Sequence, residues 1–550
     1  MERMGKNAQL NSVNTQKLAK EMFYAFWIIM TLVKALGFYE GQRVYTLGIG
    51  ISFLCIVVKM VLEKRTRREN MMMALLLVLG AVIYFCSTEK TPLILIFLVI
   101  GMEGIDVKKT FRIGLGIWSV CFLMMATLEI LGLRYGAFVV HEKLGLGPVI
   151  RWSLGYTHPN VLQITYSVIA VLILFLSEKK GIEQLKLLIL LFLGNLWVFL
   201  YAVSYTGFIM GTGALVLCFY FDNLARFSRI ERGLIYLFIP GCVTLSIVIP
   251  YLCGEGMPLR PLDGILNKLL NTRPRCVQVY LKQGLHLFGA SFTSEQVGNF
   301  ALDSSFATLL IRDGVIFFLL VILAYMGMTV YYVKHRMRKE LFLLLSLSLA
   351  GITEPFLFNT SFKNMTMVLM GAWVWTMLAK YRRKEMADAN AETGLPESDC
   401  TGQEGIEKET ADAIGVFDIS GILSARKRVP QKIRWGLILA AVLIGILSGI
   451  LRYAAWEKPE YIYVSTDIRD EISNPDMVCV TDPAAEIAAG NPVYGWPGAD
   501  VPMGRYSGNL ILLEQIRGAA GYAALGMAWS LILLEGCVTI VYLSRGEKKV

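Results

Sequence analysis

Charged residues are scarce in this sequence. Only 17% of the 550 residues are Asp, Glu, Lys or Arg, whereas 55% are hydrophobic and the mean hydropathy is +0.54. Soluble globular chains carry roughly 25% charged residues, so the composition excludes a set of soluble domains. Many apolar stretches exceed the ~18 residues that distinguish a membrane span from a buried core segment. The sequence therefore predicts an integral membrane protein.

Metal-ligand and redox motifs are also missing. The chain has four histidines, and its ten cysteines are scattered, with no CxxC pair and no Cys/His spacing typical of a metal site. We therefore expect neither a metal nor a cofactor. Cys253 and Cys276 fall on extracytoplasmic segments, where free buried thiols are favoured over a disulfide between them.

Positive charge is concentrated between the apolar stretches. The net charge is +10, yet Lys and Arg form short blocks in the connections rather than a basic, aromatic-rich polar domain. This placement is typical of the positive-inside rule and argues against a nucleic-acid partner. If the amino terminus is cytoplasmic, the basic clusters at 63–70, 106–112, 178–181, 334–340 and 380–385 all lie on the cytoplasmic side.

The apolar stretches predict an all-α, polytopic fold with about fourteen transmembrane helices. These lie near residues 22–38, 44–62, 71–87, 91–105, 113–133, 160–177, 185–203, 206–221, 233–251, 313–333, 341–357, 364–380, 435–452 and 521–543. An even number of spans places both termini in the cytoplasm.

The predicted helices divide the chain into a body and an appendix. Residues 1–380 form a twelve-helix membrane domain. Residues 381–434 form a cytoplasmic polar linker, which we expect to be disordered because its segment 386–425 is polar and acidic in character, with few large apolar residues. Residues 435–550 form a two-helix appendix with an extracytoplasmic segment at about 453–520.

Two outer connections of the body are long, at 134–159 and 252–305, and long loops often carry function. In the second loop, residues 261–271 and 274–289 have Leu, Val and Tyr at spacings of three and four. This spacing predicts short amphipathic helices on the membrane surface or across the mouth of a cavity.

Positive charge in these outer loops needs a reason, because the positive-inside rule disfavours it there. The basic residues are Arg134, Lys143, Arg151, Arg260, Lys268, Arg273, Arg275 and Lys282, and three of the four histidines, His141, His158 and His286, lie in the same loops. Arginine binds phosphate oxygens two at a time, so the set indicates an anion site. The alternative is solvated charge attracted to lipid head groups.

Several short motifs follow one another in an order typical of one family. They are RWSLGYTHPN (151–160), LLNTRPR (269–275), HLFGASF (286–292), ALDSSF (301–306) and GITEPFLFNTSFKN (351–364). On these motifs, residues 20–380 resemble the O-antigen polymerase and ligase family of bacterial envelope polysaccharide synthesis. Family members show an Arg before a Gly-Phe-x-His-Pro-Asn turn. Here Arg151, Gly155, His158, Pro159 and Asn160 match it, and Tyr156 replaces the Phe.

The chain also departs from the family pattern. The segment 271–273 keeps the Arg of a small-Gly-Arg turn but not its Gly, and 303–306 matches an Asp-Asn-Ser-Tyr pattern only in part. The segment 204–207 lacks the Arg of a Ser-Arg-Thr-Gly hairpin.

The resemblance implies glycan transfer from an undecaprenyl diphosphate carrier to another lipid-linked unit, without a metal, on the outer leaflet of a bacterial plasma membrane. The implied partners are the undecaprenyl-diphosphate-linked glycan, membrane lipid, and a flippase and chain-length regulator of the same pathway. A ligase that passes finished glycan to another acceptor is the near variant. A lipid-linked oligosaccharide flippase and a structural membrane scaffold are the alternatives from other classes.

Departure of the leaving group in such a reaction builds charge on a diphosphate. Arg273, with Arg151 or Arg275 in support, would stabilise that charge. Asn160 and Asn364 are further candidates for substrate binding.

The acceptor hydroxyl also needs a proton acceptor, for which the candidates are His158, His286, Asp303 and Glu354. Glu354 lies at the outer end of an apolar span. An ionisable group costs free energy there, so its presence indicates a function. An ion pair between helices is its alternative role, and capping or an interfacial position is the alternative for the two histidines. Lys34 is expected to extend toward a helix end.

Overall fold

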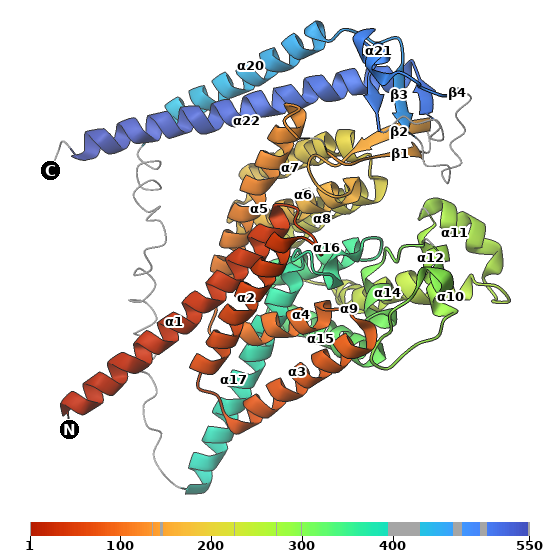
Figure 1. The fold of residues 1–550 in the computed structure, drawn as a ribbon. Coiled ribbons are helices and arrows are strands. Elements are labelled where there is room, and N and C mark those ends of the chain that lie inside the picture. The colour runs from red at the N-terminus through yellow and green to blue at the C-terminus, as the bar shows by residue number, and fades with distance from the viewer. Residues whose placement is uncertain are drawn as a thin grey trace. The chain divides into compact units, whose positions relative to one another are not determined.

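The computed structural model describes residues 2–134, 136–143, 147–224, 226–270, 272–298, 300–393, 429–465, 476–495 and 503–547. It is mostly helical (Figure 1). The chain forms two compact units. One contains Met1–Met125 and Gly155–Arg382, and the other contains Ala126–Leu154 and Arg383–Val550.

The first unit contains most of the long helices. They are α1 (Glu2–Ala35), α2 (Arg43–Leu62), α3 (Arg67–Ser87), α4 (Thr91–Gly101), most of α5 (Val107–Ile130), α6 (Pro159–Leu176), α7 (Gly181–Ala202), α8 (Tyr205–Asn223), α9 (Arg229–Val243), α15 (Val315–Lys334), α16 (Arg338–Ala350) and the beginning of α17 (Met365–Thr393). A π-helical segment (Thr244–Val248) continues α9 into α10 (Ile249–Leu252). Short helices fill the connections that follow: η2 (Arg260–Leu262), α11 (Asp263–Leu269), α12 (Arg273–Leu281), α13 (Ser294–Val297), α14 (Ser305–Ile311) and η3 (Pro355–Phe358).

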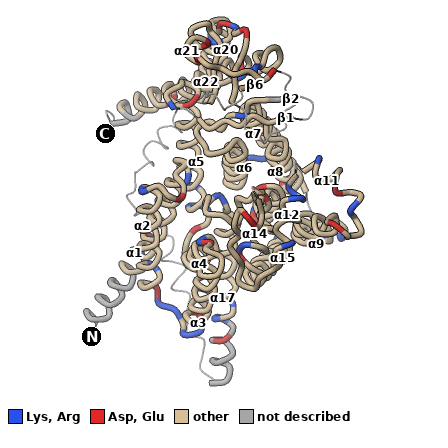
Figure 2. Tube along the Cα trace, turned by 45° about the vertical axis from the view of Figure 1, so that its right-hand side comes forward, with Lys and Arg blue, Asp and Glu red and all other residues tan. Residues whose placement is uncertain are grey.

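Ten helices of the described residues are long and apolar enough to cross a membrane. They are α2, α3, α5, α6, α7, α8, the continuous stretch Arg229–Leu252, α15, α20 (Gln431–Ala455) and most of α22 (Asn509–Glu547). The chain is therefore a membrane-embedded, multi-pass helical protein, which confirms this part of the prediction. The number fourteen stays a prediction. Figure 2 shows Lys and Arg concentrated in connections such as that between α2 and α3.

The basic connection between α2 and α3 is neutralised by carboxylates. Lys59 is fully buried, reaches the end of α2 and pairs with Glu63. Arg65 donates through Nε to the Glu103 carboxylate at 2.6 Å. A capping box of Thr66 and Glu69 then begins α3. Because buried charges are stable only when paired and hydrogen-bonded, this network fixes the ends of three helices.

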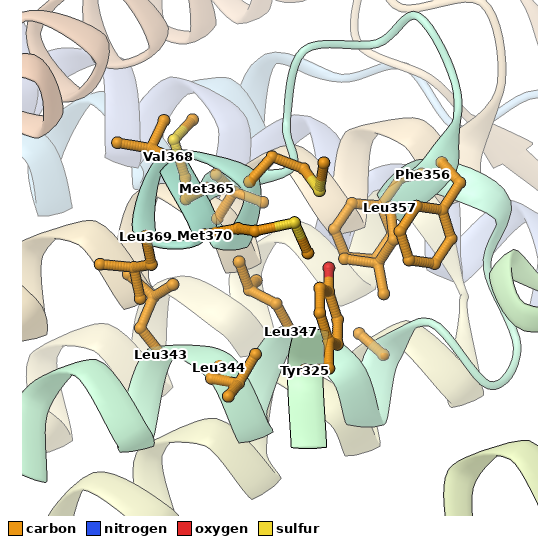
Figure 3. Close-up of a cluster of buried hydrophobic side chains, with 14 of the residues drawn as sticks. Tyr325, Leu343, Leu344, Leu347, Phe356, Leu357, Met365, Val368, Leu369 and Met370 are labelled. Atoms are coloured by element: carbon orange, nitrogen blue, oxygen red, sulfur yellow. The ribbon is translucent and has the colours of Figure 1, made fainter. Parts of the chain in front are cut away.

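The core of the first unit lies under the connection between α16 and α17. Figure 3 shows apolar side chains from α15, α16, η3 and α17 packed into one cluster. Phe356, Leu357 and Met365 belong to it, and each is at most 5% exposed. Burying such a side chain contributes about 1.5–3 kcal/mol. The cluster therefore gives residues 354–365 a rigid base, although η3 is only four residues long.

The second unit combines two long helices with short strands. α20 and α22 lie side by side (Figure 1). Their close approach depends on small residues, because a Cβ on Gly445 would lie 2.7 Å from the Ala523 carbonyl oxygen. Between the two helices in sequence, α21 (Pro483–Ala488) accompanies a four-stranded sheet of order β4-β6-β3-β5. Its strands are β3 (Ile462–Ser465), β4 (Met477–Val478), β5 (Val493–Tyr494) and β6 (Met503–Tyr506).

The outer loop at 134–159 contributes a hairpin to this second unit. Strand β1 (Phe138–Lys143) pairs antiparallel with β2 (Gly147–Trp152). Val140 and Ile150 of the hairpin join Ile462 and Val464 of β3 in a separate apolar core. Residues that the sequence analysis placed in the body therefore fold with the carboxyl-terminal residues. The all-α prediction describes the helices, and the six strands found among the described residues lie in connections between them.

The predicted linker is only partly described. α17 continues through Thr393, past the predicted boundary at residue 380. The predicted disorder over the rest of 381–434 falls largely outside the described residues.

Candidate functional site

The 252–305 loop places Arg273 at the beginning of a short helix. Thr272 has a left-handed backbone (φ 61°), and α12 begins at Arg273, with Pro274 in its first turn. Proline suits this position because its fixed φ matches the helix and the helix start requires no N–H from it. The two amphipathic stretches are helical, as predicted, but shorter. They form α11 and α12 rather than 261–271 and 274–289.

Arg273 forms a buried ion pair with Glu354. Its Nη2 donates to Glu354 Oε1 at 2.9 Å, and the two side chains are 9% and 6% exposed. Its Nη1 donates to the Leu270 carbonyl at 3.4 Å. Removing one partner of a buried pair typically costs about 3–5 kcal/mol, because the other charge stays buried. The ion pair that was the alternative role for Glu354 is therefore present.

Ser305 fixes the backbone on both sides of Glu354. Its Oγ donates to the Glu354 carbonyl at 2.5 Å and accepts from the Leu357 N–H at 3.2 Å. Its N–H donates to the Gly351 carbonyl at 2.9 Å. The motifs at 301–306 and 351–364 are thus brought together, and they hold Glu354 in an extended conformation before η3.

A small pocket with a cavity volume of about 10 Å³ lies beside Arg273, which is room for about one water molecule. Its polar lining residues are Ser246, Arg273, Ser304 and Thr353, and the other lining residues are apolar. In the described part of the chain, Ser246 Oγ, Arg273 Nε and Thr353 Oγ1 are buried without a hydrogen-bond partner. Ser246 lies in the π-helical segment, a distortion that often marks functional sites. Because unpaired buried polar atoms are unfavourable, these three atoms favour a hydrogen-bonding group in the pocket.

Asp303 directly precedes Ser304, which lines the pocket beside Arg273. Burial raises the pKa of the Asp303 carboxyl, and the positive charge of Arg273 acts in the opposite direction. Its carboxylate is therefore more basic than that of an exposed Asp, which suits a proton acceptor.

Lys363 is a site residue that the sequence analysis missed. It is 4% exposed, and its Nζ lies 5.3 Å from the ring centroid of Trp118 and 5.8 Å from that of Tyr156. Burial, with a contribution from Lys34, lowers the pKa of Lys363 to about 7, although Glu354 acts to raise it. The electrostatic effect of Glu354 thus reaches Lys363 as well as Arg273.

The connection between η3 and α17 turns Lys363 into the protein. Phe362 has a left-handed backbone (φ 59°), which is rare for a bulky residue. Its ring contacts those of Phe26 and Trp27, with centroids 5.7 and 5.4 Å apart. Asn364 donates to the Leu357 carbonyl, and its Oδ1 accepts from the Thr366 N–H at 3.1 Å. The described hydrogen bonds of Asn364 therefore stabilise the start of α17, whereas the sequence analysis proposed that Asn364 binds substrate.

The remaining candidates are described by their own positions and contacts. His158 is half-buried at the start of α6, where its Nδ1 accepts from the Asn160 N–H at 3.1 Å, which is the capping role given above as the alternative. His286 is exposed, and its carbonyl accepts from the Val315 N–H at 3.1 Å. Arg275 is exposed, with its guanidinium carbon 5.7 Å from the Phe300 ring centroid. Arg151 is 5% exposed and belongs to β2 of the second unit.

The cysteines of the outer loop form no disulfide with each other. Cys253 and Cys276 are both buried free thiols. Among the described residues, no group of three or more His, Cys, Asp or Glu side chains is placed to hold a metal ion. The candidate site comprises Arg273, Glu354, Asp303 and Lys363, together with the pocket beside Arg273.

No protein family, curated protein or solved structure matches the chain. The residues and their geometry therefore carry the argument for function.

Proposed function

We propose that the protein is a membrane glycosyltransferase that polymerises undecaprenyl-diphosphate-linked repeat units into cell-surface polysaccharide. The reaction takes place on the outer face of a bacterial plasma membrane and requires no metal. In this proposal the chain has about fourteen spans with both termini in the cytoplasm. Arg273, Asp303 and Lys363 then lie in outer connections, and Glu354 lies at the outer end of a span.

The observation that carries the proposal is the buried Arg273 beside a pocket with unpaired polar atoms. Its guanidinium is held by Glu354 and Leu270, whereas its Nε has no partner among the described residues. Such a preorganised cation stabilises charge that develops on a leaving group far better than a solvated one. A diphosphate is the leaving group that best fits a guanidinium.

The proposed step is a displacement at the anomeric carbon of the donor glycan. The acceptor hydroxyl oxygen forms the new glycosidic bond while the bond from that carbon to the diphosphate oxygen breaks. Undecaprenyl diphosphate leaves with the electron pair, and Arg273 stabilises its charge. Asp303 is the favoured proton acceptor among the candidates because it lies next to Arg273 and burial makes it more basic. Glu354 acts as a positioning residue for Arg273.

Cells provide a test that separates this reaction from lipid transport. Arg273→Ala should abolish high-molecular-weight polysaccharide, and single-unit lipid-linked intermediate should accumulate on the outer leaflet. Arg260→Ala, which removes an exposed arginine of the same loop, is the matched control and should make normal polymer. Accumulation on the inner leaflet would instead indicate a flippase, and normal polymer from the Arg273 variant would contradict the proposal. A ligase would leave polymer length unchanged but lose its transfer to the final acceptor.

A further inference from the structure

Two lysines, Lys34 and Lys363, come together at the connection that follows Glu354. Lys34 is near the end of α1, where its Nζ donates to Thr360 Oγ1 at 3.5 Å and lies 4.0 Å from the ring centroid of Tyr45. Lys363 follows Thr360 by three residues and is buried against Trp118. Two ammonium groups are thus brought together by α1 and the connection between η3 and α17.

Neither lysine has a carboxylate partner in the part of the chain that the structure describes. The carboxylates whose charges reach them are Glu40 for Lys34 and Glu354 for Lys363. Both are already bonded to other cations, because Glu40 pairs with Lys90 and Glu354 pairs with Arg273. Like charges that are close and partly desolvated repel each other. An anion bound between the lysines would remove that repulsion.

One further hydrogen-bond donor and the start of a helix lie beside Lys363. Trp118 is fully buried, and its Nε1 has no hydrogen-bond partner among the described residues. An indole N–H is a donor only, so it requires an acceptor. α17 begins at Met365, directly after Lys363 and Asn364, and the first turn of a helix is its positive end. All of these groups favour an anionic ligand that accepts hydrogen bonds.

We propose that Lys34 and Lys363 form a second phosphate-binding contact, which takes phosphate oxygens of the lipid carrier while Arg273 takes those nearer the sugar. This inference rests on the proposed function for the identity of the carrier. Glu354 connects the two contacts, since it bonds Arg273 and acts electrostatically on Lys363. A diphosphate has two phosphate groups, so each of the two contacts would take one of them.

The proposal makes a specific prediction for the thermal stability of the protein without ligand. Lys363→Met removes a buried charge and keeps most of the side-chain volume, so the empty variant should be at least as heat-stable as the wild type. The same variant should bind phosphate groups at least tenfold more weakly. A purely structural lysine would give the opposite pattern, with lower stability and unchanged binding. Lys282→Met is the matched control because Lys282 is an exposed lysine of the outer loop.

The test uses the full chain in nanodiscs of zwitterionic lipid, with the shift in thermal unfolding temperature as the readout. The probes are farnesyl diphosphate, inorganic diphosphate and phosphatidylglycerol, titrated separately. We expect farnesyl diphosphate to stabilise the wild type and the Lys282 variant, and the Lys363 and Lys34→Met variants to need at least tenfold more of it. Stabilisation by inorganic diphosphate with the same dependence on Lys363 supports the anion site.

Two results would overturn the proposal. One is equal farnesyl diphosphate binding by the wild type and the Lys363 variant. The other is a Lys363-dependent shift with phosphatidylglycerol but with neither diphosphate, which would identify a bilayer lipid as the ligand. Because the readout is binding, a failure to polymerise glycan leaves this test intact, and the two proposals can fail separately.

Discussion

Glu354 Oε1 lies 2.9 Å from Arg273 Nη2, although the two residues are 81 positions apart in the sequence. The pair joins the connection after α16 to the first turn of α12. It holds the guanidinium beside the pocket with one nitrogen unpaired among the described residues.

The ion pair predicts strong coupling between the two residues. Arg273→Met and Glu354→Gln should each destabilise the protein, by about 3–5 kcal/mol for full loss of a buried pair and less where Gln still accepts a hydrogen bond. The double variant should lose less stability than the sum of the two single losses, because no charge then stays buried without a partner. Thermal unfolding of the four proteins measures the coupling, and additive effects would show that the pair does not form.

Asp303 should set the acid limb of the pH profile of activity. Because burial raises its pKa above the ordinary 3.8, its carboxylate should become protonated, and activity should fall, at a higher pH than for an exposed Asp. Asp303→Asn should be nearly inactive at every pH. The same shift acts on stability in the opposite sense, since a raised carboxyl pKa means stability that is lost as pH rises above 3.8. An unchanged acid limb in an active Asn variant would assign the proton to another residue.

Lys363 predicts that stability rises with pH. Its pKa is lowered from 10.5 to about 7 by burial and by Lys34, against Glu354, so the unfolded chain binds more protons than the folded one between these values. The free energy of unfolding should increase across this range by up to about 1.4 kcal/mol per pH unit. Lys363→Met should lose that increase, and the exposed-lysine variant Lys282→Met should keep it. The pH dependence of thermal unfolding measures both, and a slope that persists without Lys363 would contradict this assignment.

The second unit predicts a contrast between two glycines of α20. A Cβ on Gly445 would meet the Ala523 carbonyl and Met527, whereas a Cβ on Gly436 would meet nothing within 4 Å. Gly445→Ala should therefore destabilise the packing of α20 on α22 by about 1–3 kcal/mol. Gly436→Ala should stabilise by about 0.5–1 kcal/mol through helix propensity. Protease sensitivity of α20 in the full chain distinguishes the two, and equal effects would place the helix contact elsewhere.

Local patterns of apolar residues predict the long helices, but they do not predict which distant residues pair with one another. Apolar length alone identified the long spans, because a membrane helix satisfies its own backbone. The sequence singles out Arg273 and Glu354 separately. Arg273 is a positive charge in an outer loop, and Glu354 is an ionisable group at the outer end of an apolar span. Their contact depends on how two distant connections pack, which periodicity does not encode.

The hairpin and Lys363 show what was missed. The run Phe138-Val139-Val140 is β-branched and aromatic, which signals a strand, but it lies in a loop between two strong helix patterns. Lys363 lies between Phe362 and Asn364 in what resembles an ordinary connection. The available signal was its position at the outer end of a span, where positive charge needs a reason. Its burial follows from the left-handed backbone of Phe362, which no composition argument reveals.

Reconstitution tests the central claim most directly. Purified full chain in liposomes, supplied with a defined lipid-linked repeat unit in the presence of EDTA, should produce a ladder of longer glycans. Arg273→Ala should reduce the rate at least 100-fold, as expected for the loss of a group that stabilises developing charge, while Arg260→Ala retains it. A ladder that requires Mg²⁺, or one that forms equally well without the Arg273 guanidinium, would contradict the account.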